Sequence, residues 1–149
     1  MRVISKILDP DIKKGSLRIA FASSDGKTIN EHFGWADTFV IYDVSEKEFH
    51  KVGRVKFLQE KEPIPCQPED RHFSKINELN SCHIIYSQSI GGPAAARLTQ
   101  NKIHPIVVRR NPTIERTLYE LKTILKGPVL PPWIRRLIEQ QESDSFDYA

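Results

Sequence analysis

The order of apolar runs along the chain constrains its fold more than any other feature. Residues 17–22 form a short apolar run that ends in a Ser-Ser-Asp-Gly turn, which predicts a buried strand followed by a loop. Residues 38–44 are β-branched and aromatic, and residues 49–57 partly alternate beyond a polar turn, so the two predict an antiparallel hairpin. Three strands are therefore expected before the first helix.

The second half of the chain alternates helices with strands. Apolar side chains recur at helical spacing over residues 69–80, and the alanine-rich residues 93–100 predict another helix. Strands are expected at 83–87 and 103–108, and this order implies a parallel pair with a right-handed crossover. The sequence therefore predicts an α/β fold with a mixed five-stranded sheet and helices covering its faces.

The remaining segments define the expected boundaries. Asn111 can cap a helix that begins at Pro112 and ends before Gly127, and residues 131–138 predict a short amphipathic helix. Residues 58–68 contain three prolines and are expected to form a surface connection. At 149 residues we expect one domain at 17–138, with an N-terminal extension at 1–16 and a flexible acidic tail at 139–149.

The formal net charge of +3 hides an uneven distribution of basic side chains. Residues 97–136 hold nine lysines and arginines against two glutamates, whereas the last thirteen residues hold four acids and no base. Such a basic block would attract an anionic ligand or partner, although it can equally be a solvated surface. No apolar run approaches the ~20 residues of a membrane span, and the start of the chain does not read as a secretory signal, so we expect a cytoplasmic protein.

Two segments predict a binding site. His32 follows the first predicted strand in a loop, where its imidazole could point outward and ligate iron, or be an ordinary surface histidine. Gly91 and Gly92 precede the helix at 93–100, where free amides and the helix dipole favour an anion; close packing against a strand is the alternative. Arg97, about a turn inside that helix, could add charge or face solvent. Together these residues predict one site with a metal ligand and an anion cradle.

Other candidate residues are weaker. Cys82 begins a strand and is expected to be a small buried hydrophobe, while Cys66 lies in a loop and is freer to act. The two cysteines lack zinc-site spacing, which favours free thiols in a reducing compartment. His104 is expected to be structural in a central strand, and Trp133 to anchor the last helix or dock a partner. The other histidines are interpreted as ordinary: His50, His72 and His83.

Three classes of function compete. A metal-dependent nuclease needs several converging carboxylates, but only Asp43 lies near a predicted strand end. A hydrolase triad of Ser24, Asp25 and His32 would place all three residues in one loop, and no G-x-S-x-G elbow is present. Nucleic-acid binding is favoured by the basic block and by Trp133, but the sequence pI of about 8.9 is modest and no basic-aromatic sheet motif occurs. A carrier of an anionic metal cluster is therefore preferred, with a regulatory or nucleic-acid-binding domain of the same fold as the alternative.

Several motifs in order also carry a family resemblance. They are Ala20-Phe21-Ala22-Ser23-Ser24-Asp25-Gly26, His32-Phe33-Gly34, Cys82, Ile90-Gly91-Gly92-Pro93-Ala94-Ala95-Ala96-Arg97-Leu98, Ile103-His104-Pro105-Ile106 and Pro131-Pro132-Trp133. From about residue 17 to 138 the chain resembles the nitrogenase iron–molybdenum cofactor biosynthesis family, most closely its NifX-type carriers.

The resemblance implies a ribonuclease-H-like fold and a non-catalytic role in nitrogen fixation. In that role the protein holds an iron–sulfur cofactor precursor, for a molybdenum or a vanadium system, while the precursor passes between assembly proteins. His32 matches the histidine of the family's H-F-G motif, which makes it the expected iron ligand. The expected cofactor-binding residues are His32, Gly91, Gly92 and Arg97, and neither nucleic acid nor a membrane is expected as a partner.

Overall fold

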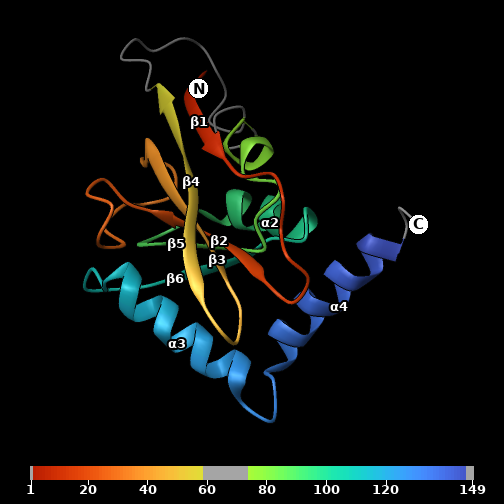
Figure 1. The fold of residues 1–149 in the computed structure, drawn as a ribbon. Helices are drawn as coiled ribbons and strands as arrows, with labels where there is room; N and C mark the ends of the chain where they lie inside the picture. The colour runs from red at the N-terminus through yellow and green to blue at the C-terminus, as the bar shows by residue number, and fades with distance from the viewer. Residues whose placement is uncertain (1, 59–73, 147–149) are drawn as a thin grey trace.

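The fold is a mixed six-stranded sheet with helices on both faces (Figure 1). The computed structural model describes residues 2–58 and 74–146. The strands lie in the order β1-β4-β3-β2-β5-β6. They span Arg2–Leu8 (β1), Leu17–Ala22 (β2), Thr38–Val44 (β3), Phe49–Leu58 (β4), Ile84–Ser87 (β5) and His104–Val107 (β6). Strands β2, β5 and β6 are parallel, whereas β3 runs antiparallel to both β2 and β4.

The five strands expected from the sequence are present, but the prediction of a five-stranded sheet is wrong. The sixth strand, β1, pairs antiparallel with β4 and comes from the segment assigned to an N-terminal extension. Its sequence is interrupted by serine and lysine, so it lacks a strand pattern. The better signal is Gly53 in β4, where an added Cβ atom would lie 1.9 Å from the carbonyl oxygen of Ile7. Only glycine admits β1 at this distance.

Each face of the sheet has its own apolar core. Along β2 the side chains alternate, so that Leu17, Ile19 and Phe21 lie in one cluster and Ala20 and Ala22 in the other. The first cluster is covered by α3 (Ile114–Lys126) and α4 (Pro132–Phe146). The second is covered by the helical residues 74–78 and by α2 (Gly92–Gln100). The result is a three-layer α/β arrangement.

The helix boundaries differ from the predictions in two places. Asn111 is not the cap of α3: it has a φ of 47°, and Thr113 takes this role, since its hydroxyl accepts from the amide of Arg116 at 3.2 Å. Helix α4 continues to Phe146 rather than ending near Ile138. The predicted connection at 59–68 and the start of the helix at 69–73 lie outside the described residues. No helix in the described part is long and apolar enough to cross a membrane.

Candidate ligand-binding site

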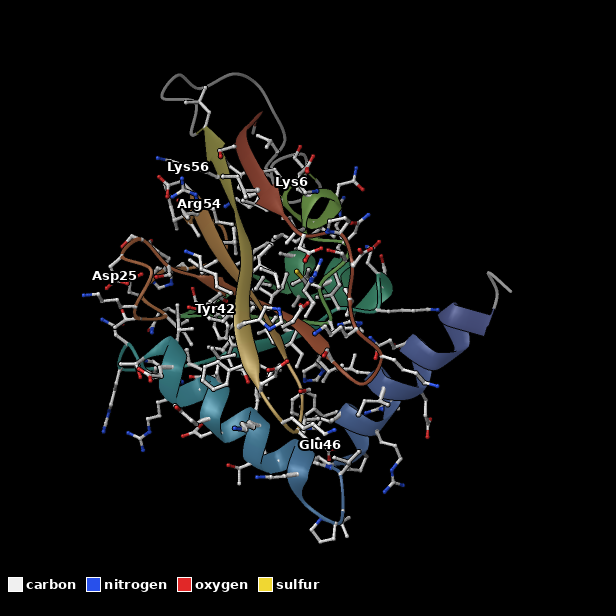
Figure 2. All side chains as sticks on the ribbon, viewed as in Figure 1. Lys6, Asp25, Tyr42, Glu46, Arg54 and Lys56 are labelled. Atoms are coloured by element: carbon white, nitrogen blue, oxygen red, sulfur yellow. The ribbon has the colours of Figure 1, made fainter. Side chains whose placement is uncertain are left out.

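The loop between β2 and β3 begins with a tight turn built around Asp25. Its carboxylate accepts from the amides of Lys27 at 2.8 Å and Thr28 at 2.9 Å, and from the hydroxyls of Thr28 and Ser23. These bonds, those from the Thr28 and Lys27 amides first, hold the pKa of Asp25 far below its ordinary value. Figure 2 shows Asp25 in this loop at the left of the view. Because the turn already uses Asp25, the triad of Ser24, Asp25 and His32 does not form.

The loop is then fixed across the edge of the sheet. Ile29 is fully buried in the core beneath α3, and Phe33 is fully buried in the core beneath α2. The amide of Ile29 donates to Pro112 at 2.9 Å, which ties the loop to the segment just before α3. Two anchors on opposite faces therefore leave His32, which is exposed, at the rim between them.

The segment after β5 meets the His32 loop directly. The amide of Phe33 donates to the carbonyl of Ser89 at 2.9 Å, and the amide of Gln88 donates to Glu31 at 2.8 Å. The His32 Nδ1 atom is also hydrogen-bonded to the Ser89 hydroxyl. This contact follows from topology, because the carboxyl ends of parallel β2 and β5 meet at one edge of the sheet. The structure thus places His32 in contact with Ser89, which lies two residues before Gly91 in the sequence.

Helix α2 opens at this edge without a cap. Gly91 is its N-cap residue, and neither a side-chain cap nor an acidic residue in the first turn is found for this helix. An added Cβ atom at Gly91 or Gly92 would meet nothing within 4 Å, so the close-packing interpretation of the glycines is wrong. Both glycines are exposed beside His32. The start of α2 is therefore exposed and has no side-chain cap, and Pro93 in its first turn has no amide hydrogen to donate.

The predicted basic block does not form one patch around the site. Arg97 is half-buried, and at position six of α2 it lies about 7–8 Å along the axis from the helix start. Arg109 and Arg110 are exposed after β6, at the same edge as His32. Arg116 instead faces Glu120 on α3 at 3.4 Å. Of the predicted block, Arg109 and Arg110 therefore follow the carboxyl end of β6, at the edge of the sheet that carries the site.

The remaining candidates have structural positions. Cys82 is buried with a free thiol, as expected, and burial raises the pKa of that thiol to about 12. Cys66 lies outside the described residues. His104 stacks on Trp133 with 4.6 Å between ring centroids, which confirms Trp133 as an anchor of the last helix. The expectation that the His104 strand is central is wrong, because β6 is an edge strand, where Pro105 is tolerated.

Three residues near the site were missed from the sequence. Ser89 contacts His32, Trp35 is 71% exposed three residues beyond it, and the buried Lys75 contacts the same loop. Ser89 and Trp35 carry no periodic signal, since both lie in loops. Lys75 carried no signal either, because it lies between the stripe positions Phe73 and Ile76, where a polar residue is expected on a helix.

The fold and this edge define a small α/β protein whose candidate site is an exposed histidine beside an uncapped helix. The family described as dinitrogenase iron-molybdenum cofactor matches residues 15–123, and the chain belongs to this family, as a member of the NifX type. Protein NifX of Sinorhizobium fredii (strain NBRC 101917 / NGR234) is 40% identical over 131 residues, which cover 86% of this chain and 81% of that protein.

Two further similarities bear on length and fold. Protein NifY of Klebsiella pneumoniae is 32% identical over 133 residues, which cover 88% of this chain but 55% of NifY. The crystal structure of PH0822 matches 78% of this chain and 99% of its own, with a TM-score of 0.54 and 20% identity. At that identity the likeness concerns the fold alone.

Proposed function

We propose that this chain binds an anionic iron–sulfur precursor of the nitrogenase cofactor and carries it between assembly proteins without catalysis. Membership of the dinitrogenase iron-molybdenum cofactor family supports nitrogenase cofactor biosynthesis as the process. The observation that carries the proposal is the exposed His32 imidazole, which is hydrogen-bonded to Ser89 just before the open start of α2. The carrier domain would be residues 17–138, with a ribonuclease-H-like fold, in the cytoplasm.

The contact with Ser89 uses the Nδ1 atom of His32, so Nε2 is the nitrogen that would ligate iron. When Nδ1–H of His32 donates to the Ser89 hydroxyl, Nε2 keeps its lone pair for iron. Hydrogen bonds of this kind commonly fix the tautomer and orientation of ligating histidines. Ser89 would therefore hold His32 ready for ligation through Nε2.

Positive charge would supply the rest of the affinity. The start of α2 carries the equivalent of about half a positive charge, and this end of the helix lies at the exposed Gly91 and Gly92. Arg97, within the same helix, and the exposed Arg109 and Arg110 would attract the cluster over a longer range. A cluster with bridging sulfides and net negative charge matches such a surface.

A weakly held cargo fits this arrangement better than a resident cofactor. Iron–sulfur clusters that stay in a protein are held by several side-chain ligands. Among residues 2–58 and 74–146, no three His, Cys, Asp or Glu side chains gather as a metal-binding group. One imidazole and a set of charges would let the cluster leave for the next protein.

The proposal of a non-catalytic role is supported by how two acids are used, Asp25 in the His32 loop and Asp43 near the amino end of β2. Asp25 accepts four hydrogen bonds within its turn, and Asp43 is paired with Arg18 in the interior. Neither carboxylate lies free beside His32 as a general base or a second metal ligand. Asp25 and Asp43 are therefore both engaged in structural contacts, which supports a binding role rather than hydrolysis.

The direct test uses iron–molybdenum cofactor extracted from dinitrogenase, and its molybdenum-free precursor, as probes. Anaerobic protein is mixed with each probe and passed through a gel-filtration column. We expect visible charge-transfer absorption and iron to elute with the protein. Clusters that elute separately from the protein would contradict the proposed function.

A further inference from the structure

Lys75 is a fully buried lysine next to the loop that carries His32. It lies in the helical segment 74–78, on the same sheet face as α2. Its Nζ atom donates hydrogen bonds to the carbonyl oxygens of Phe33 at 2.8 Å and Gly34 at 2.9 Å. Because lysines are almost never fully buried unless paired, the contact calls for a physical reason.

The loop contributes to stabilising the buried ammonium group. Besides the two carbonyl oxygens, Nζ lies 5.7 Å from the ring centroid of Phe33 and 5.8 Å from that of Phe39. Carbonyl oxygens and aromatic faces both stabilise a cation. An apolar side chain at position 75 would fill the same space without the cost of desolvating a charge. Packing alone therefore does not account for a lysine here.

The two accepting carbonyls belong to the residues that directly follow His32. The turn is closed by the His32 carbonyl, which accepts from the amides of Trp35 at 3.1 Å and Ala36 at 2.9 Å. The carbonyls of Phe33 and Gly34 thus point to a buried ammonium, while the His32 side chain is exposed. A side chain without an ammonium group at position 75 could not donate hydrogen bonds to these two carbonyls.

We propose that Lys75 is a positioning residue of the candidate site. Its ammonium group draws the carbonyls of Phe33 and Gly34 inward and thereby presents the His32 imidazole outward beside Ser89. The consequence for cluster binding rests on the proposed function, whereas the effect on the imidazole does not.

The test compares Lys75→Met with Leu121→Ala. Methionine keeps the apolar stem against the two phenylalanine rings but removes all three donors. Leu121 is a buried residue of α3 in the core of the opposite face, so its truncation destabilises the protein without removing the contacts of Lys75. The two readouts are the imidazole ¹H–¹⁵N spectrum of His32 and the affinity for extracted iron–molybdenum cofactor.

We expect Lys75→Met to shift the His32 imidazole signals and to weaken cofactor binding by about tenfold or more. Leu121→Ala should leave the His32 imidazole signals in place and the affinity for cofactor within about twofold of the wild type, since distant sites behave independently. Lys75→Arg, which keeps positive donors, should fall between the wild type and Lys75→Met. An unchanged imidazole spectrum in Lys75→Met, or an equal change in Leu121→Ala, would overturn the proposal.

The experiment also distinguishes failure of cofactor binding from failure of the Lys75→Met variant to fold. If the wild-type protein does not bind the cofactor, the proposed function fails, but the imidazole spectra still decide the role of Lys75. If Lys75→Met does not fold, the native protein is measured instead. There the Lys75 ammonium signal should exchange slowly with solvent and show couplings to the carbonyl carbons of Phe33 and Gly34. A rapidly exchanging ammonium without these couplings would refute the positioning role.

Discussion

The two ends of the parallel strands β2 and β5 each carry a histidine, but only one histidine is available to a ligand. At the amino ends, His83 donates its amide to Arg18 at 2.7 Å and accepts from the Arg18 amide through Nδ1 at 2.8 Å. At the carboxyl ends, His32 is exposed beside Ser89 and the open start of α2. The same side chain thus joins two strands at one end and faces solvent at the other.

The surroundings explain this difference. At the amino ends, the Arg18 guanidinium is fully buried and bonds both oxygens of Asp43, at 2.8 Å and 3.0 Å, close to the buried Cys82. The opposite charges of Arg18 and Asp43 are paired there, although one guanidinium nitrogen of Arg18 has no hydrogen-bond partner among the described residues. At the carboxyl ends, by contrast, the loops leave His32 and the start of α2 exposed at the edge of the sheet. A ligand-type residue therefore indicates a site only where its hydrogen-bonding capacity remains open.

The largest expected effect comes from breaking the buried ion pair of Arg18 and Asp43 at the amino ends of the strands, called here the closed end. Arg18→Met leaves Asp43 buried without its partner and should lower the free energy of unfolding by about 3–5 kcal/mol. Denaturant unfolding measures this loss, and the double variant with Asp43→Leu should recover much of it. The exposed pair of Lys6 and Glu78, at 3.0 Å, is the control, since Lys6→Ala should cost under about 1 kcal/mol. Equal losses at the two pairs would contradict the contrast between buried and exposed charge.

The second prediction concerns the buried thiol at the closed end. Burial raises the pKa of Cys82 from 9.0 to about 12, so the folded protein holds the proton more tightly than the unfolded chain. The resulting stability is fully present below about pH 9 and is lost as the pH rises toward about 12. In a Cys66→Ala background, adding Cys82→Ala should remove this part of the alkaline loss in unfolding experiments. Rapid alkylation of native Cys82 near neutral pH would contradict its burial.

The third prediction tests the role of positive charge at the carboxyl ends of the strands, where His32 is exposed. Binding of extracted cofactor should weaken as the Debye length falls below ~10 Å, and Arg97→Glu or Arg109→Glu should weaken it further by severalfold. Lys122→Glu on α3 is the matched control, because α3 covers the other face. Binding that is indifferent to both salt and charge reversal would indicate an uncharged site.

The smallest expected effect is the binding of nucleic acid. A protein that neutralises several phosphates loses orders of magnitude in affinity between about 50 and about 200 mM salt. The basic side chains are spread over α2, α3, α4 and the loop after β6, so we expect only weak non-specific binding at low salt. Fluorescence anisotropy with single- and double-stranded oligonucleotides measures it. Sub-micromolar affinity for either form would favour the nucleic-acid-binding alternative over the carrier.

The parts of the fold with clear periodicity were predictable from the sequence. Strands β2 to β6 and helices α2 and α3 were expected within a few residues, because apolar spacing reports local structure. Strand β1 was not, since an edge strand is held by pairing and by the room that Gly53 leaves for it. The cap of α3 is Thr113 rather than Asn111, because Asn111 adopts a left-handed conformation and the start of the helix is bonded to the distant Lys27.

The candidate site was predictable in its parts but not in its contacts. The loop position of His32 and the glycines before α2 follow from local patterns, and their meeting follows from parallel strands. The contacts of Ser89 and Lys75 depend on side chains that are 57 and 42 residues distant from their partners. No local spacing encodes such pairs.

The most direct test of the central claim compares the two histidines at the two ends. Anaerobic titration with extracted iron–molybdenum cofactor is carried out on the wild type, His32→Ala and His83→Ala, together with melting curves. His32→Ala should weaken binding by at least about tenfold while changing stability by only tenths of a kcal/mol. His83→Ala should cost about 1–3 kcal/mol of stability, because the Arg18 amide loses its acceptor, and leave affinity unchanged. Unchanged affinity in His32→Ala, or equal losses of affinity in both variants, would contradict the assignment of the site to the carboxyl ends of the strands.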